Sequence, residues 1–153
     1  MELIDRSVLD FALIEGSFPK ETYGHRLISR ERFVGICAPE HPFAGREVTL
    51  PELMRETLIC RENGSGTRAI LENLLTEYNE SISHFRRHIT ISTFSVILDL
   101  VRKNLGVSFV FEILARSSGL ATFSLEGTNI QREFNFIYLQ NSGNEEKIDY
   151  LMK

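Results

Sequence analysis

The stretch that decides the fold is LICRENGSGTR at residues 58–68, which is typical of a strand, a loop and a helix start in immediate succession. Its first three residues form a short apolar run, as a buried strand does. Gly64 and Gly66 permit the positive φ angles of a tight loop, and Ser65 or Thr67 can cap a helix that follows. The sequence therefore predicts a strand-to-helix junction here.

The expected helix covers residues 69–78, where apolar side chains recur at helical spacing. Its unpaired amides and the positive end of its dipole would face the loop, a position that suits a carboxylate, sulfate or phosphate. The glycine spacing differs from that of a nucleotide P-loop and no lysine follows the second glycine, so a triphosphate is not expected. Two interpretations stay open on these residues: a helix cap that needs no ligand, and an anion site.

Composition narrows the class of protein. The chain has 153 residues, of which 42% are hydrophobic, enough for one or two small domains with a real core. A net charge of -4 leaves no basic surface of the kind that duplex DNA requires. We find no apolar run long enough to span a membrane, and the amino terminus is too charged for a signal peptide. We therefore expect no membrane contact and a cytoplasmic location.

Strands and helices are expected to alternate along the chain, which favours α/β layers around a mostly parallel sheet. A capping-box pattern at residues 49–52 predicts a short helix, and Gly106 is expected to end a later helix in the left-handed conformation. Strands are expected at 10–14, 27–28, 33–38, 58–60, 88–92, 107–111, 121–124 and 131–138. Helices are expected near 50–55, 69–78, 93–105, 112–116 and 145–152.

Catalytic and metal motifs are weak. Cys37 and Cys60 lie in apolar runs and are expected to be buried free thiols, with a disulfide or a reactive nucleophile as the alternatives. His84 and His88 are four residues apart, but the second lies in an expected strand and no third ligand is near in sequence. We therefore expect no metal, no cofactor and no enzymatic activity.

The order of these elements resembles the effector-binding domain of LysR-type transcriptional regulators. The resemblance is carried by DFALI at 10–14, FVGI at 33–36, PEHPFA at 39–44, VTLPEL at 48–53, LICRENGSGTR at 58–68, LVRKNLGVSF at 100–109 and REFNFIY at 132–138. It implies two Rossmann-like α/β lobes of the type 2 periplasmic-binding-protein kind. Residues 39–128 would form the second lobe, and 1–38 with 129–153 would form an incomplete first lobe.

The resemblance also implies a function: sensing a small effector, expected to be anionic, in a cleft between the lobes of a bacterial transcriptional regulator. A solute-binding protein of a transport system is the alternative. DNA contact would depend on an amino-terminal winged helix-turn-helix that this sequence lacks, and the uncovered sheet edge of the first lobe predicts self-association. The residues that the resemblance places at the cleft are Glu15, Gly16, Ser17, Gly64, Ser65, Gly66, Thr67, Arg68, Thr93, Phe94 and Ser95.

Overall fold

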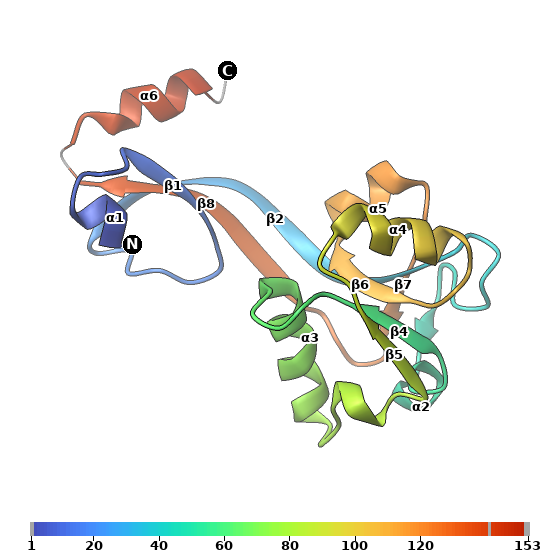
Figure 1. Cartoon of the computed structure of the whole chain (residues 1–153). Coiled ribbons are helices and arrows are strands. Elements are labelled where there is room, and N and C mark those ends of the chain that lie inside the picture. Colours follow the sequence, from blue (N-terminus) through green and yellow to red (C-terminus); the bar gives the residue numbers. More distant parts are fainter. Residues whose placement is uncertain (1, 141, 152–153) are drawn as a thin grey trace. The chain divides into compact units, whose positions relative to one another are not determined.

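The computed structural model describes residues 2–140 and 142–151, and its internal contacts divide the chain into two units. Unit 1 contains the described residues of Met1–Glu31 and Gln131–Lys153, and unit 2 is Arg32–Ile130. Figure 1 shows the elements in chain order. The assignment of residues 39–128 to a second lobe stays a prediction.

The helices and strands have the following bounds. Helices are α1 (Glu2–Asp5), α2 (Leu50–Leu53), α3 (Gly66–Glu77), α4 (Phe94–Arg102), α5 (Glu112–Ser118) and α6 (Asn144–Leu151), with a 3-10 turn η1 (Ile82–His84). Strands are β1 (Phe11–Glu15), β2 (Tyr23–Cys37), β3 (Glu47–Val48), β4 (Thr57–Cys60), β5 (Arg87–Thr90), β6 (Ser108–Phe111), β7 (Ala121–Leu125) and β8 (Gln131–Leu139). The two extended segments expected at 27–28 and 33–38 are thus parts of one strand, β2. The end of the helix expected at 145–152, residue 152, lies outside the described residues.

Unit 1 is built on a sheet in the order β1, β8 and the first part of β2. Strands β1 and β8 are antiparallel, with Phe11 opposite Tyr138 and Glu15 opposite Phe134. A small core forms where Ile137 of β8 packs with Ile4 of α1 and the Tyr23 ring. This apolar contact fixes the short helix α1 against the sheet.

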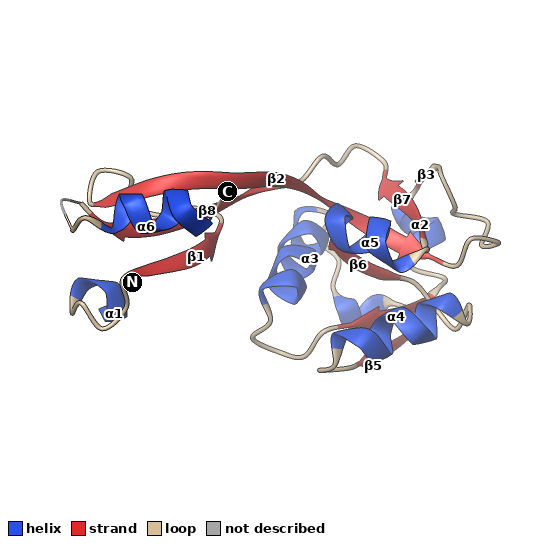
Figure 2. Ribbon diagram, turned by 90° about the horizontal axis from the view of Figure 1, so that it is seen from above, coloured by secondary structure: helices blue, strands red, loops and turns tan. Residues whose placement is uncertain are grey.

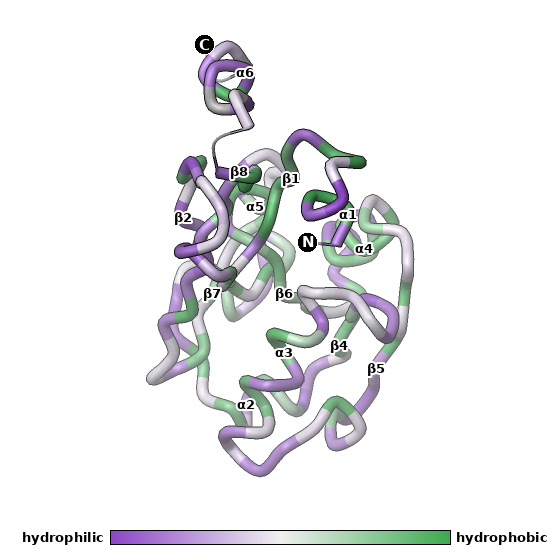
Figure 3. Tube along the Cα trace, turned by 90° about the vertical axis from the view of Figure 1, so that its left-hand side faces the viewer, coloured by the Kyte–Doolittle hydropathy of each residue, from purple (hydrophilic) through white to green (hydrophobic). Residues whose placement is uncertain are grey.

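Unit 2 contains β4 and β5 in parallel, and a parallel bridge between Leu58 and Val107 joins β4 to the start of β6. Strands β6 and β7 both pair antiparallel with β2, and β3 runs parallel to β7. In Figure 2 the helices α3, α4 and α5 lie around these strands, and Figure 3 shows apolar colouring along β4 and β6. Buried residues from β2, β4, α4, β6, α5 and the turn after α5 form one cluster: Ile36, Ile59, Ile97, Val101, Val110, Ala115 and Leu120.

The expected mostly parallel sheet is wrong, because the sheet is mixed. Strands joined through a helix do run parallel, as β4 and β5 show, since a crossover returns the chain to the same edge. Strand β2 reaches unit 2 as a direct continuation of a 15-residue strand, so no crossover fixes its direction. The alternation of strands and helices in the sequence therefore predicts the direction only of strands that are joined through a helix. It does not predict how β2 pairs.

The end of α4 also differs from the prediction. Asn104, with φ +56°, takes the left-handed conformation that was expected of Gly106. Gly106 is needed for another reason: a Cβ atom placed on it would lie 2.4 Å from the backbone oxygen of Thr57. The glycine therefore allows the chain before β6 to lie directly against β4.

Candidate functional site

Two helices of unit 2 begin at the same edge of its sheet. Strands β4 and β5 are parallel and end side by side, with Cys60 opposite Thr90. Helix α3 follows β4 after a five-residue loop, and α4 follows β5 after a three-residue loop. In open α/β sheets, ligands bind outside the carboxyl ends of strands. The residues predicted at 64–68 and at 93–95 thus share this edge.

The α3 start has the predicted loop but not the predicted side-chain cap. Gly64 has φ +86°, whereas Gly66 lies in the first helical turn, so the positive φ expected of Gly66 is wrong. Ser65 is the N-cap residue, with extended backbone, but its side chain makes no capping hydrogen bond. Its hydroxyl instead lies 2.9 Å from that of Thr67. The interpretation of Ser65 or Thr67 as a side-chain cap of the helix is therefore wrong.

The α4 start is similar. Thr93 is the N-cap residue and again makes no side-chain capping hydrogen bond. Thr93 and Ser95 are exposed at this edge, but Phe94 is half-buried and packs against the apolar cluster of unit 2. Two of the three residues predicted here are therefore open to a ligand, and the third mainly anchors the helix.

The first-turn amides of both helices remain available. In the described part of the chain, the N–H groups of Gly66, Thr67 and Arg68 have no hydrogen-bond acceptor, and the same holds for residues 94–96. Such donors at a helix start, together with the helix dipole, favour an anion. The edge thus carries two sets of donors of this kind.

The arginines near the edge are already engaged. Arg61 forms a two-pronged ion pair with Glu62, at 2.8 Å from Nε and 2.9 Å from Nη2. This contact, helped by the backbone amide of Glu62, lowers the pKa of the Glu62 carboxyl to about 2. Arg68 donates from Nε to Glu72 and from Nη1 to the Arg61 carbonyl oxygen and the Thr90 hydroxyl. These bonds leave Nη1 of Arg61 and Nη2 of Arg68 without a partner among the described residues, so an anion at this edge would meet the main-chain amides and at most these two side-chain nitrogens.

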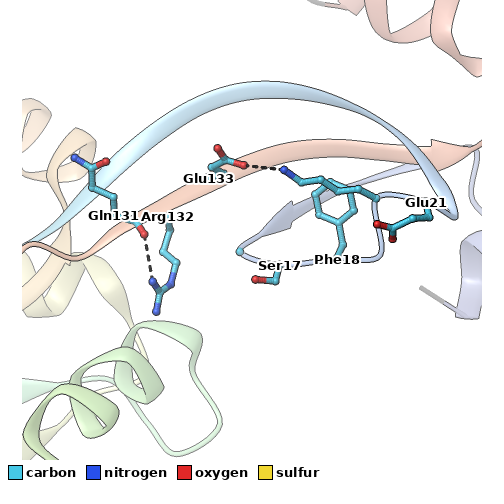
Figure 4. A pocket seen from close by; sticks show the side chains of 8 residues that line it. Ser17, Phe18, Glu21, Gln131, Arg132 and Glu133 are labelled. Carbon is cyan, nitrogen blue, oxygen red and sulfur yellow. Dashed lines mark hydrogen bonds and ion pairs between the residues drawn. The ribbon is translucent and has the colours of Figure 1, made fainter. Parts of the chain in front are cut away.

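Two of the three predicted residues of unit 1, Gly16 and Ser17, line a hollow of about 660 Å³, and Glu15 comes just before them at the end of β1. Figure 4 shows Ser17, Phe18 and Glu21 on the loop after β1, and Gln131, Arg132 and Glu133 on β8. Gly16 also lines the hollow, has φ +89° and donates its N–H to the Glu133 carbonyl oxygen. The predicted site residues thus form two groups, one in each unit, and a shared cleft stays a prediction.

Charges of both signs surround this hollow. Glu15 pairs with Arg132 at 3.4 Å, and Glu133 pairs with Arg30 at 3.0 Å and with Lys20 at 3.6 Å. Arg30 and Lys20 both lower the pKa of Glu133, with the Arg30 hydrogen bond as the largest cause. Sequence reasoning missed Arg132 and Glu133, because only the register between β1 and β8 brings them beside the loop. It also missed Lys20, which lies on the loop itself and is tied to the site only by its ion pair with Glu133.

The cysteine prediction is confirmed. Cys37 and Cys60 are both free and buried. Burial, helped by the charge of Glu40, raises the pKa of the Cys37 thiol to about 11. His84 is engaged by Glu80 at 2.6 Å, and the described residues contain no group of three His, Cys, Asp or Glu side chains that could hold a metal ion.

A comparison with protein-family models matches residues 1–152 to the LysR substrate binding domain. The chain belongs to this family. The match confirms the resemblance that the sequence motifs indicated. The α3 and α4 starts therefore lie within a LysR substrate-binding domain.

Curated relatives of this LysR domain are transcriptional regulators. It is 33% identical over 110 residues to the RuBisCO operon transcriptional regulator of Allochromatium vinosum, covering 69% of this chain and 35% of the relative. It is 31% identical over 136 residues to the HTH-type transcriptional regulator CbbR of Rhodospirillum rubrum, covering 86% and 44%. The chain thus spans less than half the length of these relatives.

Solved structures confirm the α/β fold. The LysR domain is similar to the CcmR regulatory domain of Synechocystis PCC6803 in complex with 2-PG, with a TM-score of 0.77 at 22% identity, over 99% of this chain and 76% of that one. It is also similar to the effector binding domain of QuiR in complex with shikimate, with a TM-score of 0.70 at 16% identity, over 99% and 73%. Among the described residues, no helix is long and apolar enough to cross a membrane.

Proposed function

We propose that this chain is the effector-sensing part of a transcriptional regulator and that it binds a small anion at the carboxyl edge of β4 and β5. The observation that carries the proposal is the pair of helix starts at one sheet edge, both without a side-chain cap. The free amides of two helices, and the positive ends of the two helix dipoles, would face an anion bound there. The hydroxyls of Ser65, Thr67, Thr93 and Ser95 add neutral donors.

The names of similar proteins support this proposal. The CcmR regulatory domain was solved with 2-PG and the QuiR effector binding domain with shikimate, so small molecules bind other domains of this fold. The curated relatives named above regulate transcription, which disfavours the transport alternative and an enzymatic role. We place the regulator in the cytoplasm, where it reaches DNA through a domain outside this sequence.

Sensing requires no chemistry on the ligand. The effector needs only to bind one conformation of the regulator more tightly than another, and a coupling free energy of about 1–3 kcal/mol is typical of such control. Gly16 and Ser17, which line the unit 1 hollow, and Glu15, which pairs with Arg132 of its lining, are proposed to contribute the remaining contacts to the effector.

The test is a calorimetric titration of the chain with 2-PG, shikimate and inorganic phosphate, at low and high salt. Loss of one hydrogen bond to a charged ligand should weaken binding by roughly 10-fold to 150-fold in Ser65→Ala and in Thr67→Ala. Thr49→Ala is the matched control, because Thr49 also begins a helix but caps it with its own side chain.

Unchanged affinity in both hydroxyl variants would contradict the proposed role of 65–67. Recognition would then be sought at Thr93 and Ser95 by the same titration. If no anion binds the wild-type chain, the anion proposal itself fails.

We also propose that the chain self-associates through β1, which is an edge strand in the described sheet of unit 1. The Leu13 side chain on β1 is 56% exposed, and Leu3, Val8 and Leu9 are exposed nearby in sequence. An uncovered edge with apolar neighbours favours strand pairing between copies. Sedimentation velocity should show a concentration-dependent dimer or larger species, and a monomer at all concentrations would contradict this.

A further inference from the structure

The Arg68 side chain links three segments of unit 2. Its Nε donates to Oε1 of Glu72 at 2.8 Å, one turn further along α3. Its Nη1 donates to the Arg61 carbonyl oxygen at 3.1 Å, just after β4, and to the Thr90 hydroxyl at 3.5 Å, at the end of β5. The side chain is only 14% exposed. The guanidinium therefore bonds to the ends of both strands from the first turn of α3.

These contacts use Nε and Nη1 of the guanidinium and leave only Nη2 for a ligand. Glu72 also balances the charge of Arg68, which reduces the attraction left for an anion. We infer that Arg68 is a positioning residue that holds the α3 and α4 starts at a fixed separation, so that one anion can bind the amides of both. This inference rests on the proposed anion site and replaces the sequence-based expectation that Arg68 itself binds the effector.

The geometry requires arginine rather than lysine. A guanidinium is planar and presents its N–H groups in a rigid fork, so two of its nitrogens reach Glu72 and the two strand ends together. A lysine ammonium is a single charged centre on a flexible stem and cannot reproduce that fork. Arg68→Lys therefore keeps the charge and removes the side-chain link from α3 to the two strand ends.

This difference makes the role testable. We would measure 2-PG affinity at low and high salt, and amide hydrogen exchange of residues 91–96 without ligand, in wild type, Arg68→Lys and Arg68→Met. If Arg68 positions the helix starts, both variants should bind about 10-fold more weakly or worse, and both should exchange faster at 91–96. Arg116→Met is the matched control, since Arg116 also pairs with a glutamate four residues away, on α5.

The Thr90 hydroxyl gives a second and milder probe. Thr90→Val should weaken binding about 3-fold, Thr90→Ser should restore it, and Arg68→Met combined with Thr90→Val should be no weaker than Arg68→Met alone. The unfolding midpoints of all variants show whether a loss of affinity follows from a general loss of stability. Thr90→Ser should restore affinity because it restores the hydroxyl.

Wild-type affinity in Arg68→Lys would show that only the charge matters and would overturn the inference. So would unchanged exchange at 91–96 in Arg68→Met. If wild type binds neither 2-PG nor phosphate, the proposed function fails, while the exchange data still decide whether Arg68 links the two helix starts.

Discussion

Thr49 and Ser65 both occupy the N-cap position of a helix, but only Thr49 uses its side chain as a cap. The Thr49 hydroxyl accepts from the Glu52 amide, and Oε2 of Glu52 accepts from the Thr49 amide at 2.8 Å. Ser65 instead hydrogen-bonds to Thr67. Helix α2 therefore satisfies its own first turn, whereas α3 leaves its first turn open.

The residue three positions after the N-cap explains the difference. In α2 it is Glu52, an anion that suits both the capping box and the positive end of the helix dipole. In α3 it is Arg68, a cation at that same end, which the helix dipole disfavours. A bound anion would offset that disadvantage. A capping carboxylate at this position would compete with such an anion for the same amides. Ser or Thr at a helix start thus does not by itself indicate a formed cap: a cap forms where Glu52 follows and does not form where Arg68 follows.

The largest expected loss of stability is in Gly106→Ala. Gly106 lets the segment before β6 lie against β4, and β4 is the strand that leads into the open start of α3. In Gly106→Ala the new Cβ would meet the Thr57 backbone oxygen at 2.4 Å, so β4 must shift. We expect a loss of about 2–3 kcal/mol in the free energy of unfolding, measured with urea. Gly64→Ala is the control: its Cβ meets nothing within 4 Å, and its left-handed backbone alone should cost about 1 kcal/mol. Equal losses in the two variants would show that the close approach of Gly106 is not what matters.

The second effect separates the two N-caps directly. Thr49→Ala should lower the free energy of unfolding by about 1 kcal/mol without changing the affinity for 2-PG, because it removes a formed cap. Ser65→Ala should change stability by only a few tenths of a kcal/mol, because no cap is present to lose. Urea unfolding of both variants checks this, and a loss in Ser65→Ala as large as that in Thr49→Ala would contradict the contrast.

The same contrast shows how far the sequence could be interpreted. Local patterns predicted the capping box at 49–52, the strand-loop-helix junction at 58–68 and the buried cysteines, because spacing and polarity along a few residues are enough for each. The direction of β2, the role of Gly106 and the contacts of Arg68 were out of reach. They depend on strand register and on residues far apart in sequence, such as Gly106 with Thr57 and Arg68 with Thr90. The family resemblance predicted residues at 64–68 and 93–95, which do share one sheet edge, but not that Phe94 packs into the core. Their role in binding stays a prediction.

The smallest expected effect is the pH dependence of the α2 cap. The Thr49 amide and hydroxyl and the Arg46 guanidinium donate to Glu52 and lower the pKa of its carboxyl from 4.5 to about 2, with the Thr49 amide as the largest cause. Because the folded-state pKa lies below the unfolded-state value, the stability that this carboxylate adds is fully present above pH 4.5 and is lost as the pH falls towards 2. We expect NMR titration of the Glu52 side chain to give a midpoint near 2, and Thr49→Ala to move that midpoint part of the way towards 4.5, since the hydroxyl donor is then gone. Unfolding curves between pH 5 and pH 2 should show wild type losing its advantage over Glu52→Gln across this window. A wild-type midpoint near 4.5 would mean that the box does not hold the carboxylate in solution, and the contrast between the closed α2 start and the open α3 start would lose its electrostatic basis.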